Sequence, residues 1–286
     1  MIKFNKINKR GKVIFMKKIF ALTTLLIAFF AIPALAETQS LFIEGDHGKL
    51  AAVLQIPDSN SKCPIVIICH GFMGKKDSPL LENLANDLEA AGIASIRFDF
   101  NGHGESEGRF QDMTVPNEIE DAKKVFNFVK DMNRFSSISI AGHSQGGVVS
   151  SMVAGELGAD NIKAVALFAP AAVLRDDAIR GNVFGVQFNA LNPPEYVEIM
   201  GHRVGRNYFL LARDLPIYET AKKYQGPACL IHGTGDIIVP YTYSSRYHEI
   251  WENSEIRIIP EWDHGFRGHE AETAKIGAEF FIKHLK

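Results

Sequence analysis

The sequence has few cysteines, and their spacing does not suggest a disulfide framework. Among 286 residues only three are cysteine: Cys63, Cys69 and Cys229. Cys63 and Cys69 flank one short apolar run, and a strand of that length holds its ends much farther apart than the roughly 7 Å that a disulfide allows between Cα atoms. An odd number of cysteines with this spacing favours buried free thiols. The protein must therefore draw its stability from its core.

The sequence also lacks an excess of charge of either sign. Its 31 Lys and Arg residues oppose 33 Asp and Glu residues, which gives a formal net charge of -2 with histidine neutral. Binding to a nucleic-acid backbone or to an anionic membrane needs concentrated basic charge. We therefore expect no nucleic-acid partner, and we expect a small neutral or weakly charged substrate.

Long apolar runs are missing except near the N-terminus. Residues 19–32 are apolar, follow the basic pair Lys17 and Lys18, and precede a small-residue stretch that ends at Ala36. This order predicts a secretory signal peptide over residues 1–36, cleaved after Ala36. The alternative is an uncleaved anchor helix, but a spanning helix needs about 20 apolar residues and this run is shorter.

The start of the chain has two candidate positions. Met16 is followed directly by the basic pair, as in an ordinary signal peptide, so residues 1–15 are a candidate misassigned upstream start and both Met1 and Met16 stay open. After cleavage we expect a secreted or periplasmic protein with no stable membrane association.

Short apolar runs of the strand type alternate with longer helical patterns along the rest of the chain. Helices are predicted at residues 80–91 and 118–135, where apolar residues recur at three- and four-residue spacing. Strands are predicted at residues 50–54, 65–69, 93–98, 138–141, 164–168, 228–232 and 255–259. This alternation predicts an α/β catalytic domain over residues 37–286, with a mostly parallel twisted sheet covered by helices.

Residues 171–223 interrupt the alternation. They contain prolines, glycines and aromatic residues without a clean strand or helix period. A structureless segment of this length is improbable inside a compact domain unless it has a function. We therefore predict that it is a cap inserted over the active site.

The strongest chemical signal is the run Gly-His-Ser-Gln-Gly at residues 142–146. It follows the predicted strand 138–141 and precedes a helix start rich in small residues. A glycine two positions away on each side of the serine permits the sharp strand-to-helix turn that exposes a nucleophile. The run predicts Ser144 as a catalytic nucleophile.

A serine hydroxyl needs a base to take its proton and an acid to orient that base. In this strand–turn–helix setting the acid and then the histidine follow the serine, each on a loop after a later strand. Asp236 lies in the Gly-rich loop after residues 228–232, and His264 lies after residues 255–259. We predict the triad Ser144, Asp236 and His264.

Other residues compete for these roles. Asp263 is a candidate acid, but sequence neighbours seldom have the geometry to pair, and a loop hydrogen bond is its alternative role. His232, His248 and His269 are candidate bases, yet His232 ends a strand and the other two lie on predicted helix surfaces. Loop placement favours His264.

The oxyanion formed on attack needs two preorganised donors, usually backbone N–H groups. We predict the N–H of Gln145, directly after the nucleophile, and the N–H of Phe72, in the loop at residues 70–74. His70, which precedes a glycine turn, is expected to form a structural hydrogen bond.

The sequence gives little indication of a metal or cofactor. Residues 101–106 follow a predicted strand and could suggest a metal or phosphate loop, but no Walker lysine accompanies them and a turn is favoured. The ten histidines form no H-E-x-x-H pattern, and no C-x-x-C is present. We expect no metal and no cofactor.

With these residues the chain resembles the α/β-hydrolase superfamily over nearly all of the mature region. Within it, the chain is most similar to bacterial feruloyl (cinnamoyl) esterases, which cleave hydroxycinnamate esters of plant cell-wall polysaccharide. Beyond the triad, the likeness rests on residues 70–72, 99–104, 169–172, 177–178, 181–182 and 215–219. The resemblance implies that Asp177 and Tyr208 of the cap contact the aromatic hydroxyl, and that Phe184 replaces a polar residue of some relatives.

The sequence thus predicts a secreted serine carboxylic-ester hydrolase, and the resemblance implies a feruloyl esterase. A lipase or acylglycerol hydrolase, a general carboxylesterase, and a serine peptidase or thioesterase of the same fold stay open as alternatives. A non-catalytic binding protein would require a broken triad, and the three residues are intact. The sequence leaves the natural ester, the preferred cinnamate and the oligomeric state open.

Overall fold

The computed structural model describes residues 37–57 and 62–286. The predicted signal peptide at residues 1–36 lies outside this part of the chain. Among the described residues, no helix is long and apolar enough to cross a membrane.

An eight-stranded sheet forms the centre of the domain, in the order β1-β2-β4-β3-β5-β6-β11-β12. Its strands are β1 Glu37–Glu44, β2 Lys49–Ile56, β3 Cys63–Cys69, β4 Ala94–Phe98, β5 Phe135–His143, β6 Val165–Phe168, β11 Ala228–Gly233 and β12 Ser254–Ile259. The β1–β2 and β2–β4 pairs are antiparallel and all the other pairs in this sheet are parallel. The predicted α/β class with a mostly parallel sheet is confirmed.

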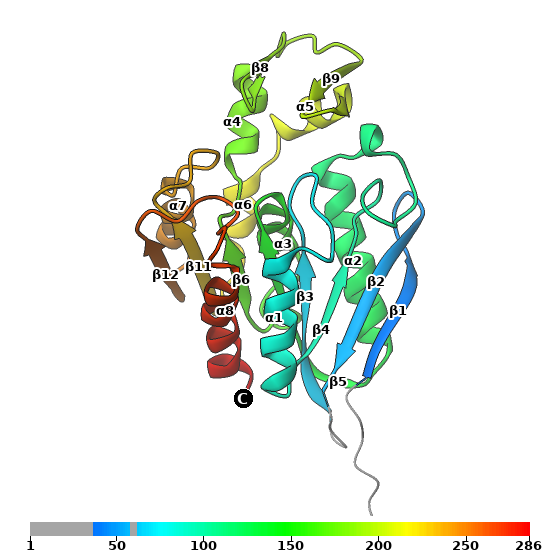
Figure 1. Cartoon of the computed structure of the whole chain (residues 1–286), viewed down its shortest axis with the longest axis vertical. Coiled ribbons are helices and arrows are strands. Elements are labelled where there is room, and N and C mark those ends of the chain that lie inside the picture. Colours follow the sequence, from blue (N-terminus) through cyan, green and yellow to red (C-terminus); the bar gives the residue numbers. More distant parts are fainter. Residues whose placement is uncertain (1–36, 58–61) are drawn as a thin grey trace, which may run out of the picture. The chain divides into compact units, whose positions relative to one another are not determined.

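Helices cover both faces of the sheet (Figure 1). They are α1 Pro79–Ala90, α2 Val115–Asp131, α3 Gln145–Leu157, α7 Thr242–Ile250 and α8 Glu270–Leu285. Alternate residues of β3 enter two separate cores: Ile65 and Ile67 pack with α2 and α3, whereas Val66 and Ile68 pack with α1 and α8. Burial on both faces explains why this strand reads as a continuous apolar run.

One predicted helix has different bounds in the structure, and one strand was not predicted. The helix predicted at residues 118–135 is α2, which begins at Val115 because the Thr114 side chain accepts a hydrogen bond from the Asn117 N–H at 3.2 Å and caps the first turn. It ends at Asp131, and Phe135 begins β5 instead. Strand β1 was not predicted, because it is an edge strand whose residues are mostly exposed and only Leu41 and Ile43 pack on the core.

The predicted free thiols are confirmed, since all three cysteines are unpaired and buried. Burial also raises the pKa of the Cys69 and Cys229 thiols to about 12. Both are therefore inert thiols of the core at neutral pH.

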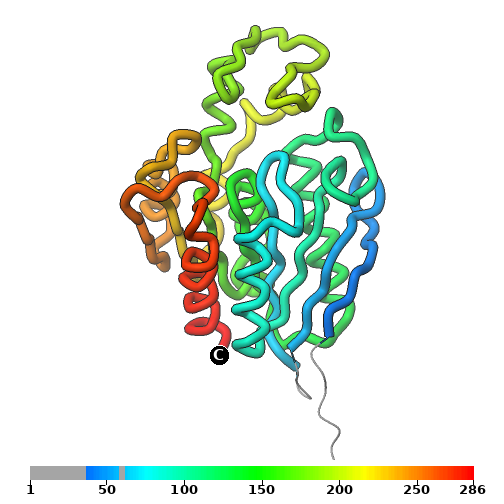
Figure 2. Tube along the Cα trace, in the orientation of Figure 1, coloured from blue at the N-terminus to red at the C-terminus, as the bar shows by residue number. Residues whose placement is uncertain are grey.

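The segment between β6 and β11 has regular structure of its own. It contains α4 Val173–Arg180, β7 Asn182–Val183, β8 Val186–Gln187, β9 Tyr196–Ile199, β10 His202–Gly205, α5 Arg206–Ala212 and α6 Ile217–Ala221. The chain trace rises from the sheet through α4, passes through two small hairpins and returns through α5 (Figure 2). Helix α6 packs against α3 in the main body, where Gly155 leaves room for the Thr220 carbonyl. We call α4 to α5 the cap.

The two cap hairpins turn in the same unusual way. Phe184 and Gly185 join β7 to β8, and Met200 and Gly201 join β9 to β10. All four residues have positive φ, at 50°, 82°, 49° and 84° in chain order. A two-residue turn with positive φ at both positions normally begins with asparagine, aspartate or glycine. Each cap hairpin therefore holds a bulky apolar residue in a strained backbone position.

Candidate active site

Ser144 sits on a tight turn between β5 and α3. Its φ of 56° and ψ of -121° lie outside the regions that a non-glycine residue favours. A Cβ on Gly142 would lie 2.1 Å from the Gly146 carbonyl oxygen, and a Cβ on Gly146 would lie 2.2 Å from the His70 carbonyl oxygen. Glycine is thus required at both positions, because the first turn of α3 presses against the ends of β3 and β5.

The three residues of the predicted triad are in hydrogen-bond contact. The Ser144 hydroxyl donates to His264 Nε2 at 2.8 Å, and His264 Nδ1 donates to Asp236 Oδ2 at 2.6 Å. The Asp236 side chain is fully buried, whereas the His264 side chain is 14% exposed. This arrangement can take the proton from the serine hydroxyl while a carboxylate stabilises the imidazolium.

Asp236 is held in its ionised form by four donors. Its Oδ1 accepts from the backbone N–H groups of Ile238 and Val239 at 2.9 and 2.7 Å, and its Oδ2 also accepts from His232 Nε2 at 3.0 Å. Burial alone would raise the pKa of Asp236, but the hydrogen bonds from His232 and His264 outweigh it and hold the pKa well below its usual range.

Two supporting histidines were not predicted. His232, which we considered only as a rival base, is the buried second donor to Asp236, and the Ser244 hydroxyl fixes its ring by donating to Nδ1 at 2.7 Å. His143 Nε2 donates to the His264 carbonyl oxygen at 2.9 Å. Burial lowers the pKa of His143 to about 4, so the ring is neutral at pH 7 and can serve as this donor. The only sequence signal for His143 is its place next to the nucleophile.

The competing candidates for the acid and the base form hydrogen bonds outside the triad. Asp263 Oδ1 accepts from the Arg267 N–H at 2.9 Å, and His248 pairs with Ser254 at 2.8 Å. His70 has the predicted structural role, because its Nδ1 donates to the Gly71 carbonyl oxygen and its Nε2 accepts from the Phe100 N–H. Its pKa is lowered to about 3 by burial.

The loop between β3 and α1 runs beside the nucleophile. A Cβ on Gly71 would lie 2.8 Å from the Ser144 Cβ, so the backbone at Gly71, directly before Phe72, passes close to Ser144. Phe72 and Gln145 both line the cavity that contains Ser144. Among the described residues no backbone or side-chain acceptor takes a hydrogen bond from the N–H of either residue, which leaves both available as oxyanion donors.

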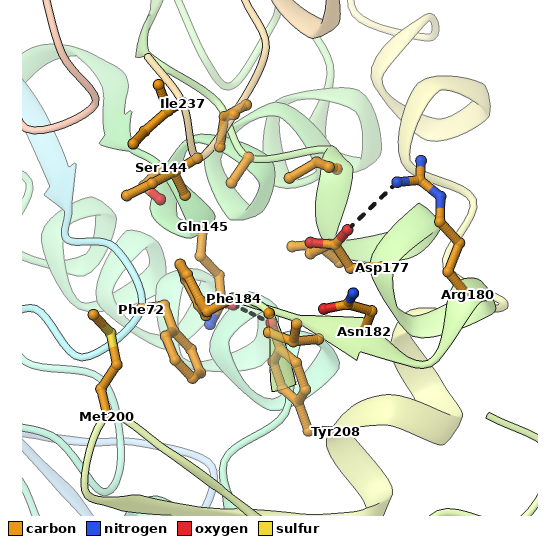
Figure 3. Close-up of a pocket in the computed structure, with 17 residues that line it drawn as sticks. Phe72, Ser144, Gln145, Asp177, Arg180, Asn182, Phe184, Met200, Tyr208 and Ile237 are labelled. Atoms are coloured by element: carbon orange, nitrogen blue, oxygen red, sulfur yellow. Dashed lines mark hydrogen bonds and ion pairs between the residues drawn. The ribbon is translucent and has the colours of Figure 1, made fainter. Parts of the chain in front are cut away.

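The Ser144 cavity has a volume of about 460 Å³ and lies between the main body and the cap (Figure 3). Asp177 from α4 and Tyr208 from α5 both line it, together with the rings of Phe72 and Phe184, which stack at 5.8 Å. The Asp177 carboxylate is 3.9 Å from Arg180. Partial burial outweighs this ion pair and raises the pKa of Asp177 to about 6.

Tyr208 makes a structural contact that the sequence did not indicate. Its hydroxyl donates to Gln145 Oε1 at 2.7 Å, and Gln145 Nε2 donates to Glu118 Oε2 at 2.8 Å. Burial raises the pKa of Glu118 well above its usual range. Because the Tyr208 hydroxyl already donates its proton to Gln145, its oxygen can only accept a hydrogen bond from a ligand.

We predict that Tyr208→Phe destabilises the fold by about 1–3 kcal/mol, because Gln145 Oε1 loses its donor in a buried site. Chemical denaturation monitored by fluorescence would measure this change in the free energy of unfolding. Tyr241→Phe, at a tyrosine that is 40% exposed, is the matched control. Equal stability of the two variants would contradict the role given to the Tyr208 hydroxyl.

Residues 101–106 form the predicted turn. The turn is anchored by Asp99, whose carboxylate accepts from the Lys76 ammonium at 3.0 Å and from the Glu105 N–H at 3.0 Å. In the part of the chain that the structure describes, no three His, Cys, Asp or Glu side chains are grouped to hold a metal ion.

Known proteins match this chain at the level of sequence and of structure. A family model described as serine aminopeptidase, S33, matches residues 60–191. The solved structure of Est1E from Butyrivibrio proteoclasticus with ferulic acid bound has 30% sequence identity, covers 86% of this chain and 99% of its own, and has a TM-score of 0.82. Human serine hydrolase BPHL is 24% identical over 259 residues, which is 84% of this chain and 80% of that protein.

A shorter match involves an uncharacterized 31.7 kDa Escherichia coli protein from the traX-finO intergenic region, 35% identical over 100 residues. The matched part spans 34% of this chain and 35% of that relative. The coverage of Est1E is nearly complete, and its architecture is the one described above. The chain therefore belongs to the α/β-hydrolase superfamily and is a serine hydrolase.

Proposed function

We propose that this serine hydrolase cleaves carboxylic esters whose acyl group is a hydroxylated aromatic acid of the hydroxycinnamate type. The observation that carries the proposal is the position of Asp177, a half-buried carboxylate in the cavity that contains Ser144. Most of the lining is aromatic or aliphatic, and Arg180, Asn182 and Gln145 are its other charged or amide side chains. Such a group can accept a hydrogen bond from a ring hydroxyl while the aromatic walls take the ring. The similarity to Est1E, solved with ferulic acid, supports the same acyl group.

In the proposed reaction the Ser144 Oγ attacks the ester carbonyl carbon as His264 Nε2 takes its proton. The backbone N–H groups of Phe72 and Gln145 stabilise the oxyanion. His264 then gives the proton to the leaving alkoxy oxygen, which releases the alcohol and leaves an acyl ester on Ser144. A water molecule, deprotonated by His264, attacks that ester; His264 then returns the proton to the Ser144 Oγ as the acid is released. Asp236 orients His264 throughout, and the reaction requires no cofactor.

We also propose that the protein acts outside the cytoplasm. The support is the N-terminal segment at residues 1–36, whose basic start, apolar run and small-residue end are typical of a secretory signal.

The test is the pH dependence of KM for two esters that differ only in ring substitution. Ionised Asp177 accepts a hydrogen bond from the ring hydroxyl, and the carboxyl ionises as pH rises through about 6. We therefore expect KM for methyl ferulate to fall about fivefold or more, relative to KM for methyl cinnamate, between pH 5 and pH 8, because a hydrogen bond to a charged group is worth about 1.5–3 kcal/mol. The ratio removes the effect of His264, which acts on both esters.

Asp177→Asn should make this ratio independent of pH. Because the folded-state pKa lies above its ordinary value, Asp177 lowers the stability of the fold as pH rises between the two values, so Asp177→Asn should not destabilise the protein at pH 8. An unchanged pH dependence of the ratio would remove Asp177 from the site. A higher kcat/KM for a short acylglycerol than for methyl ferulate would assign the enzyme to the lipase type.

A further inference from the structure

A second cavity of about 330 Å³ opens on the other side of Ser144. The two cavities share one boundary, formed by Phe72, Ser144, Phe184, Met200 and Ile238. Asp177 and Gln145 line only the first cavity, whereas His264 and Gly265 line only the second. The nucleophile thus lies between two compartments of different composition.

The position of His264 determines which part of an ester each compartment holds. The base that takes the serine proton must deliver it to the leaving oxygen, so the alcohol portion departs on the side of the imidazole. That side is the second cavity. The acyl portion then extends into the first cavity, where Asp177 lies.

The lining of the second cavity is mostly apolar. Met73, Pro79 and Leu80 line it on the main-body side, and Met200 and Phe184 line it on the cap side. Its lining contains no lysine or arginine, and its one carboxylate is Glu270, at the start of α8. Of its other polar side chains, His70 and His143 already hydrogen-bond to backbone groups, which leaves Ser78 beside the catalytic residues. A sugar would therefore leave most of its hydroxyls unpaired there, and a phosphorylated alcohol would meet the Glu270 carboxylate.

The two cap residues of this lining lower the stability of the fold. Phe184 and Met200 occupy the strained first positions of the two hairpin turns, where asparagine would fit with less strain. Both residues remain partly exposed, at 42% and 70%, so burial in the core does not explain why these positions are apolar. Two independent hairpins carry the same local strain and border the same two cavities, which indicates a role at the site.

We propose that the second cavity is an alcohol subsite that selects apolar alkyl groups of a few carbons over sugars, with Met200 and Phe184 as its cap-side wall. This inference rests on the proposed ester hydrolysis and departs from the polysaccharide ester that the family resemblance implies.

The first test is a series of ferulate esters that differ only in the alcohol: methyl, butyl and arabinosyl. We expect kcat/KM for the butyl ester to exceed that for the methyl ester about tenfold, since three more methylenes become partly buried. We expect the arabinosyl ester to be no better than the methyl ester. Equal values for methyl and butyl, or a preference for arabinosyl, would overturn the alcohol subsite.

The second test replaces Met200 with asparagine. Met200→Asn should raise the thermal midpoint, because asparagine tolerates the positive φ, so a loss of folding cannot account for a kinetic effect. It should also reduce the butyl-to-methyl ratio of kcat/KM to about threefold or less, because part of the apolar wall is lost. Leu191→Asn is the matched control, since Leu191 is an 88% exposed cap residue that lines neither cavity; its ratio should equal that of the wild type.

Failure of the subsite and failure of the proposed acyl specificity give different results. The same alcohols are therefore tested as butyrate esters. If the enzyme prefers butyl butyrate to methyl butyrate but does not hydrolyse the ferulate esters, the hydroxycinnamate proposal is contradicted and the alcohol subsite is retained. Ferulate turnover with a ratio that is the same in the wild type and in Met200→Asn would contradict the role of Met200.

Discussion

Ser144→Ala should lower kcat for methyl ferulate by roughly 10⁴-fold to 10⁶-fold while the protein stays folded. The serine Oγ is the only atom on the turn that can form the acyl ester, and His264 Nε2 would then have no hydroxyl to activate. The proposed oxyanion donors and the cavities remain, so a small acceleration over water should persist. Steady-state kinetics with the purified variant would measure the loss.

Ser40→Ala, at an exposed serine on β1, controls for the chemical change and should keep wild-type kcat. The circular dichroism spectrum should be the same for the wild type and both variants. Substantial methyl ferulate hydrolysis by Ser144→Ala would show that another residue is the nucleophile.

Asp236→Asn should lower kcat/KM by roughly 10⁴-fold, because it imposes the wrong tautomer on His264. The amide oxygen would replace Oδ1, where the N–H groups of Ile238 and Val239 donate. The amide nitrogen would then face His264 Nδ1 and donate to it. The remaining proton would sit on Nε2, which could no longer accept the proton of Ser144.

This prediction also separates Asp236 from its competitor. Asp263→Asn changes the carboxylate next to His264 in sequence, which is partly exposed and bonded to the Arg267 N–H. It should leave kcat/KM within about twofold of the wild type, since a surface hydrogen bond contributes little. Comparable losses from the two substitutions would contradict the assignment of the acid.

The sequence predicted those parts of the site that follow from the order of strands and loops. Ser144, Asp236 and His264 each follow a strand that is apolar enough to be recognised, and parallel strands bring the loops after them to one edge of the sheet. The contacts of His143 and His232 were not predictable in this way. His143 reaches a carbonyl 121 residues away, and this contact depends on how the loop after β12 folds back over β5.

The cap was predictable only as an insertion. Its strands are two to four residues long, too short to show an alternating pattern, and its turns carry phenylalanine and methionine where a turn signal requires asparagine or aspartate. The edge strand β1 was missed for a related reason, because only Leu41 and Ile43 of its eight residues pack on the core, too few to show an alternating pattern. Local patterns fail where tertiary contacts or function override local preference.

The chain of hydrogen bonds from Tyr208 through Gln145 to Glu118 has a consequence for how substrate enters. These hydrogen bonds connect the cap to Gln145, the residue after Ser144. Moving the cap away would therefore leave buried polar atoms without partners and disturb a proposed oxyanion donor. A second tie, from the Tyr243 hydroxyl to Asp176 of α4 at 2.5 Å, holds the other end of the cap. We therefore expect the entrance to the cavity to be rigid. Selectivity would then come from the shape of this entrance, and no closing motion of the cap would limit the turnover rate.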